Sequence, residues 1–146
     1  MPKPPISPAA EAILLKPNAA VLASVRPDGS PHTAAVWYDW VDGRVLLSMD
    51  ASRARLKFIE QDPRISLTVL DCDDWFVTVT VSGVAVLEPD DGLRGIDRLS
   101  QRYIGMPYPD RVSSRVTAWL DPDYWFLWEA HRRVKNLEEG GGQAKR

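Results

Sequence analysis

The sequence contains very little cysteine and no long apolar run. Its single cysteine, Cys72, excludes an internal disulfide bond. No stretch approaches the roughly 20 apolar residues that a membrane-spanning helix requires. The amino-terminal segment "MPKPPISPAA" has no long apolar core of the kind that drives secretion. We therefore expect a cytoplasmic protein that does not cross a membrane.

The chain also lacks a strong charge of either sign. Its formal net charge is −2, whereas a nucleic-acid-binding surface is usually marked by excess lysine and arginine, so no nucleic-acid partner is expected. The 146 residues are 45% hydrophobic and 26% charged, which is typical of one globular domain with its own core. That domain is expected to span residues 1–132, followed by a disordered tail over residues 133–146.

Recognisable catalytic and metal-binding motifs are absent from the sequence. His32 and His131 lie far apart in the chain and Cys72 stands alone, so no metal site is expected. There is no P-loop, no Gly-x-Gly-x-x-Gly and no nucleophile elbow. The sequence therefore assigns no catalytic side chain, and an enzyme of this kind would take its chemistry from a bound cofactor.

Alternating hydrophobic residues separated by turn residues predict a mainly β fold. Asp28-Gly29 and Asp42-Gly43 are typical of hairpin turns, and Gly83 is expected to mark a bulge in a long strand. The predicted strands cover residues 18–25, 32–40, 41–49, 64–71, 74–89 and 114–130. Short helices are expected over residues 8–16, 53–62 and 90–104. Strands joined largely as hairpins favour a closed or partly closed antiparallel barrel.

Aromatic residues are plentiful. The six tryptophans are Trp37, Trp40, Trp75, Trp119, Trp125 and Trp128. Such side chains mostly pack in cores, and less often stack on a flat ligand or fill an interface, so core packing is the favoured interpretation. Tyr38 and Tyr103 carry hydroxyls that could donate a proton, but nothing in the sequence favours that role.

The segment "DASRARLKFIEQDPR", residues 50–64, places three cations at the start of a predicted helix. Ser52 is the expected N-cap, and Asp62-Pro63 ends the helix. Cations in a first turn are unfavourable by about 0.3–1 kcal/mol each, because the helix dipole is positive there. The residue pattern leaves two interpretations open: a phosphate-binding site, or surface ion pairs such as Lys57–Glu60 and Glu60–Arg64.

Three stretches of the chain carry a resemblance to a known family. They are "VLASVRPDGSPHTAAVWYDWVDGRVLLSM", "SRARLKFIEQDPRISLTVLD" and "VTVSGVAVLE". They resemble the split-barrel flavin-binding proteins related to pyridoxamine 5′-phosphate oxidase, and most of all the actinobacterial branch that uses the deazaflavin coenzyme F420. The resemblance covers roughly residues 8–130 and implies a six-stranded antiparallel split β-barrel (Greek key) with short flanking helices. It also implies a homodimer with the cofactor at the subunit interface.

The resemblance implies where the cofactor binds. Its phosphate would meet a strand end and the basic helix, at Ser48, Met49, Arg53, Arg55 and Lys57, with Ser52 as a further hydroxyl. Its ring would lie along the strand that carries Pro31, His32, Ala35 and Trp37. The sequence departs from the family pattern at Phe58, where a polar residue is common. It also has no counterpart of the oxidase's carboxy-terminal substrate-binding segment.

The resulting hypothesis is an F420-dependent oxidoreductase. It would transfer hydride between the deazaflavin and a small organic acceptor, unsaturated or conjugated, whose identity the sequence does not specify. The alternatives are an FMN-dependent reductase or oxidase, and a non-catalytic protein that binds or carries the flavin or F420.

Overall fold

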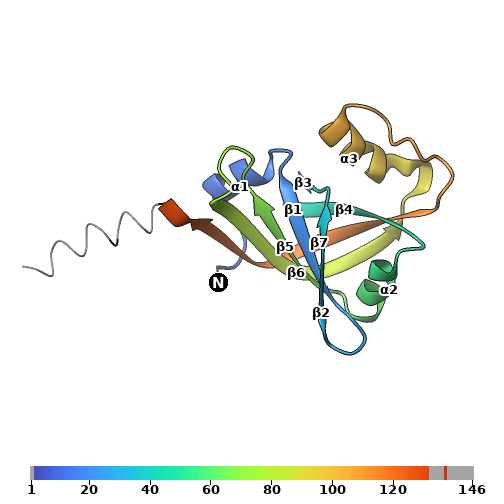
Figure 1. Ribbon diagram of the computed structural model, residues 1–146, viewed down its shortest axis with the longest axis horizontal. Coiled ribbons are helices and arrows are strands. Elements are labelled where there is room, and N and C mark those ends of the chain that lie inside the picture. The colour runs from blue at the N-terminus through green and yellow to red at the C-terminus, as the bar shows by residue number, and fades with distance from the viewer. Residues whose placement is uncertain (1, 132–136, 138–146) are drawn as a thin grey trace, which may run out of the picture.

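A seven-stranded antiparallel sheet organises the chain in the computed structural model, which describes residues 2–131 and 137 (Figure 1). The strand order is β2-β1-β5-β6-β7-β4-β3. The strands are β1 (Ala19–Val25), β2 (Pro31–Val36), β3 (Asp39–Val41), β4 (Arg44–Asp50), β5 (Arg64–Leu70), β6 (Val77–Pro89) and β7 (Arg115–Glu129). The helices are α1 (Pro8–Leu14), α2 (Ala54–Gln61) and α3 (Arg94–Ile104), with a short 3-10 helix, η1 (Asp91–Leu93), before α3.

The helix cap and the hairpin turn predicted from the sequence form at the expected residues. Ser7 caps α1 by accepting a hydrogen bond from the Ala10 amide at 3.3 Å, and proline occupies the first helical position. The β3–β4 hairpin turns through Asp42 and Gly43, both with positive φ, the conformation that a tight hairpin turn requires. The predicted hairpin turn and first helix are confirmed.

The structure has seven strands where the sequence predicts six. The expected strand 32–40 is interrupted at Trp37 and Tyr38, where the chain leaves β2 and enters β3. These two strands form opposite edges of the sheet, β2 beside β1 and β3 beside β4. Because only two residues join the edges, the sheet must curl until its edges approach, and it stays split between them. The predicted antiparallel split-barrel class is confirmed, with its strand number corrected.

The longest pair, β6 and β7, bends at the predicted bulge. Their register shifts between Ser82 and Gly83, and Gly83 pairs with Pro122. A Cβ on Gly83 would lie only 1.9 Å from the carbonyl oxygen of Asp121, so only glycine fits there. The bend lets both strands contribute to the curled sheet, and it confirms the bulge expected from the sequence.

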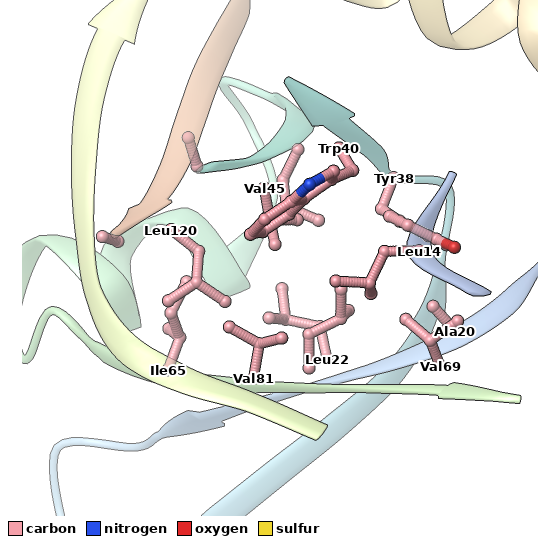
Figure 2. Packing of buried hydrophobic residues seen from close by; sticks show 14 of the residues in the cluster. Leu14, Ala20, Leu22, Tyr38, Trp40, Val45, Ile65, Val69, Val81 and Leu120 are labelled. Carbon is pink, nitrogen blue, oxygen red and sulfur yellow. The ribbon is translucent and has the colours of Figure 1, made fainter. Parts of the chain in front are cut away.

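The core fills the concave side of the sheet. Leu14 of α1 packs with Leu22, Val81 and Trp40, and Figure 2 shows these side chains pointing toward one another. Tyr38, at the split between the sheet edges, is fully buried and donates its hydroxyl to the carbonyl of Lys16 at 2.9 Å. The packing therefore closes the gap that the backbone leaves between β2 and β3.

No helix within residues 2–131 has the length and apolar content needed to cross a bilayer. The predicted disordered tail, residues 133–146, lies outside the described residues apart from residue 137.

Candidate functional site

The basic segment forms α2, but its cap differs from the prediction. Arg53 occupies the N-cap position and makes no side-chain capping bond. Ser52, the expected cap, instead donates its amide and its hydroxyl to one oxygen of Asp50, at 2.8 and 2.6 Å. The Asp50 carboxylate, at the end of β4 and only two residues before Ser52, therefore holds the Ser52 hydroxyl away from the backbone amides of the first turn of α2. The predicted Ser52 cap is wrong for this reason.

The cations at the start of α2 form no ion pair with a carboxylate among residues 2–131, although Asp50 lies near enough to Arg53 to interact with it electrostatically. No ion pair joins Arg53, Arg55 or Lys57 to a carboxylate, and Arg64 pairs with Asp62 at 2.6 Å. The alternative interpretation of this segment as surface ion pairs through Glu60 is therefore wrong. Cations without ion-pair partners add to the positive end of the helix dipole, so an anion bound at this helix start would be stabilised.

Two adjoining cavities lie between α2, β2 and the α3 region. The larger, here called the apolar cavity, measures about 590 Å³ and the second, the polar cavity, about 510 Å³. The apolar cavity is lined by Pro17, Ala19, Ala20, Ala35, Val36, Trp37, Ser48, Arg55, Ile96, Leu99, Tyr103, Tyr108 and Arg115. The polar cavity is lined by His32, Ala34, Ala35, Asp50, Arg53, Ala54, Arg55, Tyr108 and Arg115. The shared residues make the two cavities neighbouring parts of one site.

Arg55 lines both cavities and has a hydrogen-bond donor, its Nε, that is not used within residues 2–131. Its side chain is half-buried, and its Nε is buried with no hydrogen-bond partner in the part of the chain that the structure describes. Burial, reinforced by repulsion from Arg53 and Arg115, lowers the pKa of Arg55. Among the lining residues of the polar cavity, Asp50 is the single acid beside three arginines. The site therefore holds an excess of positive charge that an anion would neutralise.

Arg115, at the start of β7, is a site residue that the sequence does not reveal. Its Nε donates to the hydroxyl of Ser48 at 3.0 Å, and its guanidinium carbon lies 4.9 Å from the Tyr108 ring centre. In the β4–β7 pairing Arg115 is the register partner of Asp50. Only this long-range pairing brings it to α2, so no local motif could have identified it.

Aromatic side chains build one wall of the apolar cavity. Trp37 stacks on Tyr103 with ring centres 5.4 Å apart and planes 6° apart, and Tyr108 meets Trp37 edge-on at 6.3 Å. The Tyr103 hydroxyl donates to the carbonyl of Asn18 at 2.7 Å. Burial raises the pKa of Tyr103. Trp37 was predicted for the site, whereas Tyr103 and Tyr108 join it through α3 and the segment that follows.

The predicted site residues fall in different places. Four of them line the apolar cavity, namely Ala35, Trp37, Ser48 and Arg55. His32 and Arg53 join Ala35 and Arg55 in the polar cavity. Met49 is buried in the core, and Pro31 lines a third hollow beside Arg64. Ser52 and Lys57 are exposed and line neither of the two main cavities.

One acidic group stands apart from this site. Asp71, Cys72 and Asp73 bring their ligand atoms within 4.8 Å of one another. The ammonium of Lys16 binds both carboxylates, at 2.8 and 3.0 Å, and these hydrogen bonds raise its pKa. The lysine therefore already neutralises the charge that a cation would need.

The chain matches the pyridoxamine 5′-phosphate oxidase family over residues 6–129. A match over that span shows membership: the protein belongs to the pyridoxamine 5′-phosphate oxidase family. It therefore has the split-barrel fold in which members of this family bind flavin or F420, and the family predicted from the sequence is confirmed. No curated protein matches the chain.

Several solved structures are similar to this chain over most of its length. An F420 reductase is 26% identical, with a TM-score of 0.75, and the match covers 83% of this chain and 98% of that one. A conserved hypothetical protein from Mycobacterium tuberculosis is 28% identical, with a TM-score of 0.71 over 90% of this chain and 89% of the other. An FMN-binding relative from Nostoc punctiforme, 17% identical with a TM-score of 0.63 over 86% of each chain, shares the fold.

Proposed function

We propose that this protein is an F420-dependent oxidoreductase that transfers hydride between the deazaflavin coenzyme and a small organic acceptor. Similarity to the F420 reductase, at 26% identity over nearly the whole of that chain, favours F420 as the cofactor. The observation that carries the proposal is the unpartnered, buried Nε of Arg55, beside Arg53 and Arg115. A half-buried guanidinium whose buried Nε has a spare donor suits a phosphate-bearing ligand.

The residues at the start of α2 fit the phosphate of such a cofactor. Arg55 and Arg53 would bind it as charge-assisted donors, together with free amides of the first helical turn. Met49 would act through its backbone, because its side chain is in the core. Ser52 and Lys57 stay predictions, since both are exposed beside the polar cavity rather than in its lining.

The strand β2 fits the ring of the cofactor. Ala35 and Trp37 line the apolar cavity, and the small side chain of Ala35 leaves room for a flat ring against the strand. His32, whose Nδ1 is buried without a partner, lies on the side of the polar cavity. Pro31 lies further along the same strand. When bound, the deazaflavin would supply the hydride chemistry.

The aromatic wall would orient the acceptor and exclude water. Tyr103 and Tyr38 donate their hydroxyls to the carbonyls of Asn18 and Lys16, so both are committed to the backbone. Burial raises the pKa of Tyr38 to about 12, which keeps its proton in place at neutral pH. We therefore assign Tyr103 to the wall and Tyr38 to the core, and neither of them to proton donation.

We also propose that two copies of the chain form a homodimer with the cofactor at their interface. The outer face of β6 and β7 exposes Tyr124, Phe126 and Trp128. Beside them, Thr68 and Thr80 share a hydrogen bond at 3.0 Å, as do Ser66 and Ser82 at 2.7 Å. Hydroxyls that satisfy each other lose little on burial, so this face suits the flat surface of a second copy.

Cofactor titration distinguishes the proposed function from its alternatives. We expect the purified protein to bind F420 more tightly than FMN and to oxidise reduced F420 in the presence of a suitable acceptor. Tight FMN binding without F420 binding would favour an FMN-dependent enzyme. The FMN-binding protein from Nostoc punctiforme does not decide between the two cofactors, because its similarity to this chain extends only to the fold. Binding of F420 without turnover across a panel of conjugated acceptors would favour a non-catalytic carrier.

A further inference from the structure

The apolar cavity contains two cations and no acid. Its lining includes Arg55 and Arg115 among alanines, aliphatic side chains and aromatic rings, and no aspartate or glutamate. Asp50 and Asp110 lie near enough to Arg115 to interact with it electrostatically, but no carboxylate within residues 2–131 forms an ion pair with Arg115 or Arg55. A neutral ligand filling this cavity would leave both guanidinium groups without an ion-pair partner in a partly dehydrated space, which is unfavourable. At least one ligand of this cavity should therefore be an anion.

The two arginines are held differently. Arg55 has no hydrogen-bond partner for its Nε and belongs to α2, where the helix start faces the polar cavity. Arg115 is fixed on two sides, by the Ser48 hydroxyl at its Nε and by the face of the Tyr108 ring beneath it. This arrangement leaves the two terminal nitrogens of Arg115 as the edge available to a ligand. A fixed guanidinium fork matches the two oxygens of a carboxylate or phosphate.

Arg115 also ends a row of aromatic rings. Tyr103 stacks on Trp37, Trp37 meets Tyr108 edge-on, and Tyr108 lies against Arg115. At the Tyr103 end the cavity lining is apolar, with Leu99 and Ile96 of α3, and Arg102, which lies 5.9 Å from the Tyr103 ring centre, is not part of that lining. At the Tyr108 end the lining is cationic, with Arg115. A ligand with a flat apolar body and one terminal anionic group would satisfy both ends at once.

We propose that the apolar cavity binds a planar, conjugated carboxylic acid as the acceptor, with Arg115 binding its carboxylate and the Tyr103 and Tyr108 rings contacting its body. The role of this ligand as the hydride acceptor rests on the proposed function, whereas the chemical class of the ligand follows from the cavity alone. Arg115 is thus assigned as a specificity-determining residue. Arg55 is left to the phosphate of the cofactor.

Calorimetric titration of the cofactor-free protein with 2-naphthoate and with its neutral analogue 2-naphthamide tests the ligand class. We expect naphthoate to bind at least about tenfold more tightly than naphthamide, because a carboxylate makes a charge-assisted bidentate contact with the guanidinium that a neutral amide cannot make. Arg115→Ala should remove this preference and leave naphthamide binding within about twofold. Arg115→Lys, which keeps the charge but loses the fork, should retain part of the preference and serves if the alanine variant does not fold. Equal binding of the two probes by the unchanged protein would overturn the proposal.

A second titration separates the acceptor from the cofactor as the source of the anion. We expect naphthoate to bind as well in the presence of saturating F420 as in its absence, and Arg115→Ala to change F420 affinity less than Arg55→Ala does. Displacement of naphthoate by F420, with a large loss of F420 affinity in Arg115→Ala, would assign Arg115 to the cofactor phosphate and overturn the inference. If F420 does not bind at all but naphthoate binding still depends on Arg115, the proposed function fails and the anion-binding cavity stands.

Discussion

Gly83 and Asp121 approach so closely that the space between β6 and β7 admits no side chain. A Cβ on Gly83 would lie 1.9 Å from the Asp121 carbonyl oxygen and 3.1 Å from the Asp123 amide. All of these neighbours are backbone atoms, so no side-chain rotation can relieve the contact. The bulge at Ser82/Gly83 and the bend of both strands therefore depend on glycine at this position.

Gly83→Ala should consequently destabilise the protein strongly. We expect the free energy of unfolding to fall by about 3 kcal/mol, at the upper end of overpacking effects, because two strands must separate or the register must shift. Val84→Ala is the matched control, since Val84 lies on the same strand and is exposed, and it should cost less than about 1 kcal/mol. Chemical denaturation measures both, and a Gly83→Ala variant as stable as the control would show that the bend is not fixed by this contact.

The contact that Arg102 of α3 makes with the end of α1 gives a second prediction. Arg102 donates to the carbonyls of Leu14 and Leu15, both at 3.0 Å, and lies 3.1 Å from the carboxylate of Asp39. Its side chain is 14% exposed, whereas Arg98, which pairs with the same carboxylate at 2.6 Å, is 55% exposed. We expect Arg102→Ala to cost about 3 kcal/mol and Arg98→Ala less than about 1 kcal/mol.

Measured unfolding free energies of the two arginine variants decide this point. Equal losses would mean that Asp39 carries the interaction whichever arginine pairs with it. A larger loss in Arg102→Ala, accompanied by weaker ligand binding in the apolar cavity, would support the role of Arg102 in holding α3 over that cavity.

Burial of Tyr38 predicts a stability that declines at high pH. Desolvation raises its pKa to about 12, while the unfolded chain ionises near pH 10. Between these values the unfolded state has lost the proton that the folded state keeps, so stability is complete below pH 10 and falls as pH rises toward 12. The fall should total about 2–3 kcal/mol. Tyr38→Phe, which cannot ionise, should show a smaller decline in denaturation curves recorded from pH 8 to 12, and identical declines would argue against the burial effect.

The proposed dimer predicts a specific effect of charge on the outer face of β7. Phe126 is 41% exposed in the single chain, so Phe126→Asp should leave the fold intact while preventing a second copy from packing there. Sedimentation should show a dimer for the unchanged protein and a monomer for the variant. Val112→Asp, at a residue that is 94% exposed and precedes β7, should remain dimeric. A dimer that survives Phe126→Asp would place the interface elsewhere.

Local chemistry made much of the fold predictable. The Ser7 cap, the Asp42-Gly43 turn and the Gly83 bulge each depend on neighbouring residues, and each forms as expected. The break at Trp37 and Tyr38 was not predictable, because residues 32–40 form an uninterrupted run favourable to a strand. The run is divided into β2 and β3 because the chain crosses there from one edge of the sheet to the other, and this crossing depends on the tertiary fold.

The candidate site was predictable where its residues are close in sequence. The basic segment indicated Arg53 and Arg55, and both line the polar cavity. Arg115 and Tyr108 could not be found in the same way, because the pairing of β4 with β7 and the return of the chain after α3 bring them there. The Ser52 cap failed for a local reason, since Asp50 two residues earlier accepts both of its hydrogens.

The affinity of Arg55→Ala for F420 tests the central proposal most directly. Loss of a charge-assisted contact to the phosphate should weaken binding about tenfold to a hundredfold. The unfolding free energy of the cofactor-free variant should stay equal or rise, because the side chain removed is a partly buried charge beside Arg53 and Arg115. Arg94→Ala, at an exposed position that lines neither cavity, is the control and should bind F420 normally. Unchanged F420 affinity in Arg55→Ala would contradict the phosphate site on which the proposed function rests.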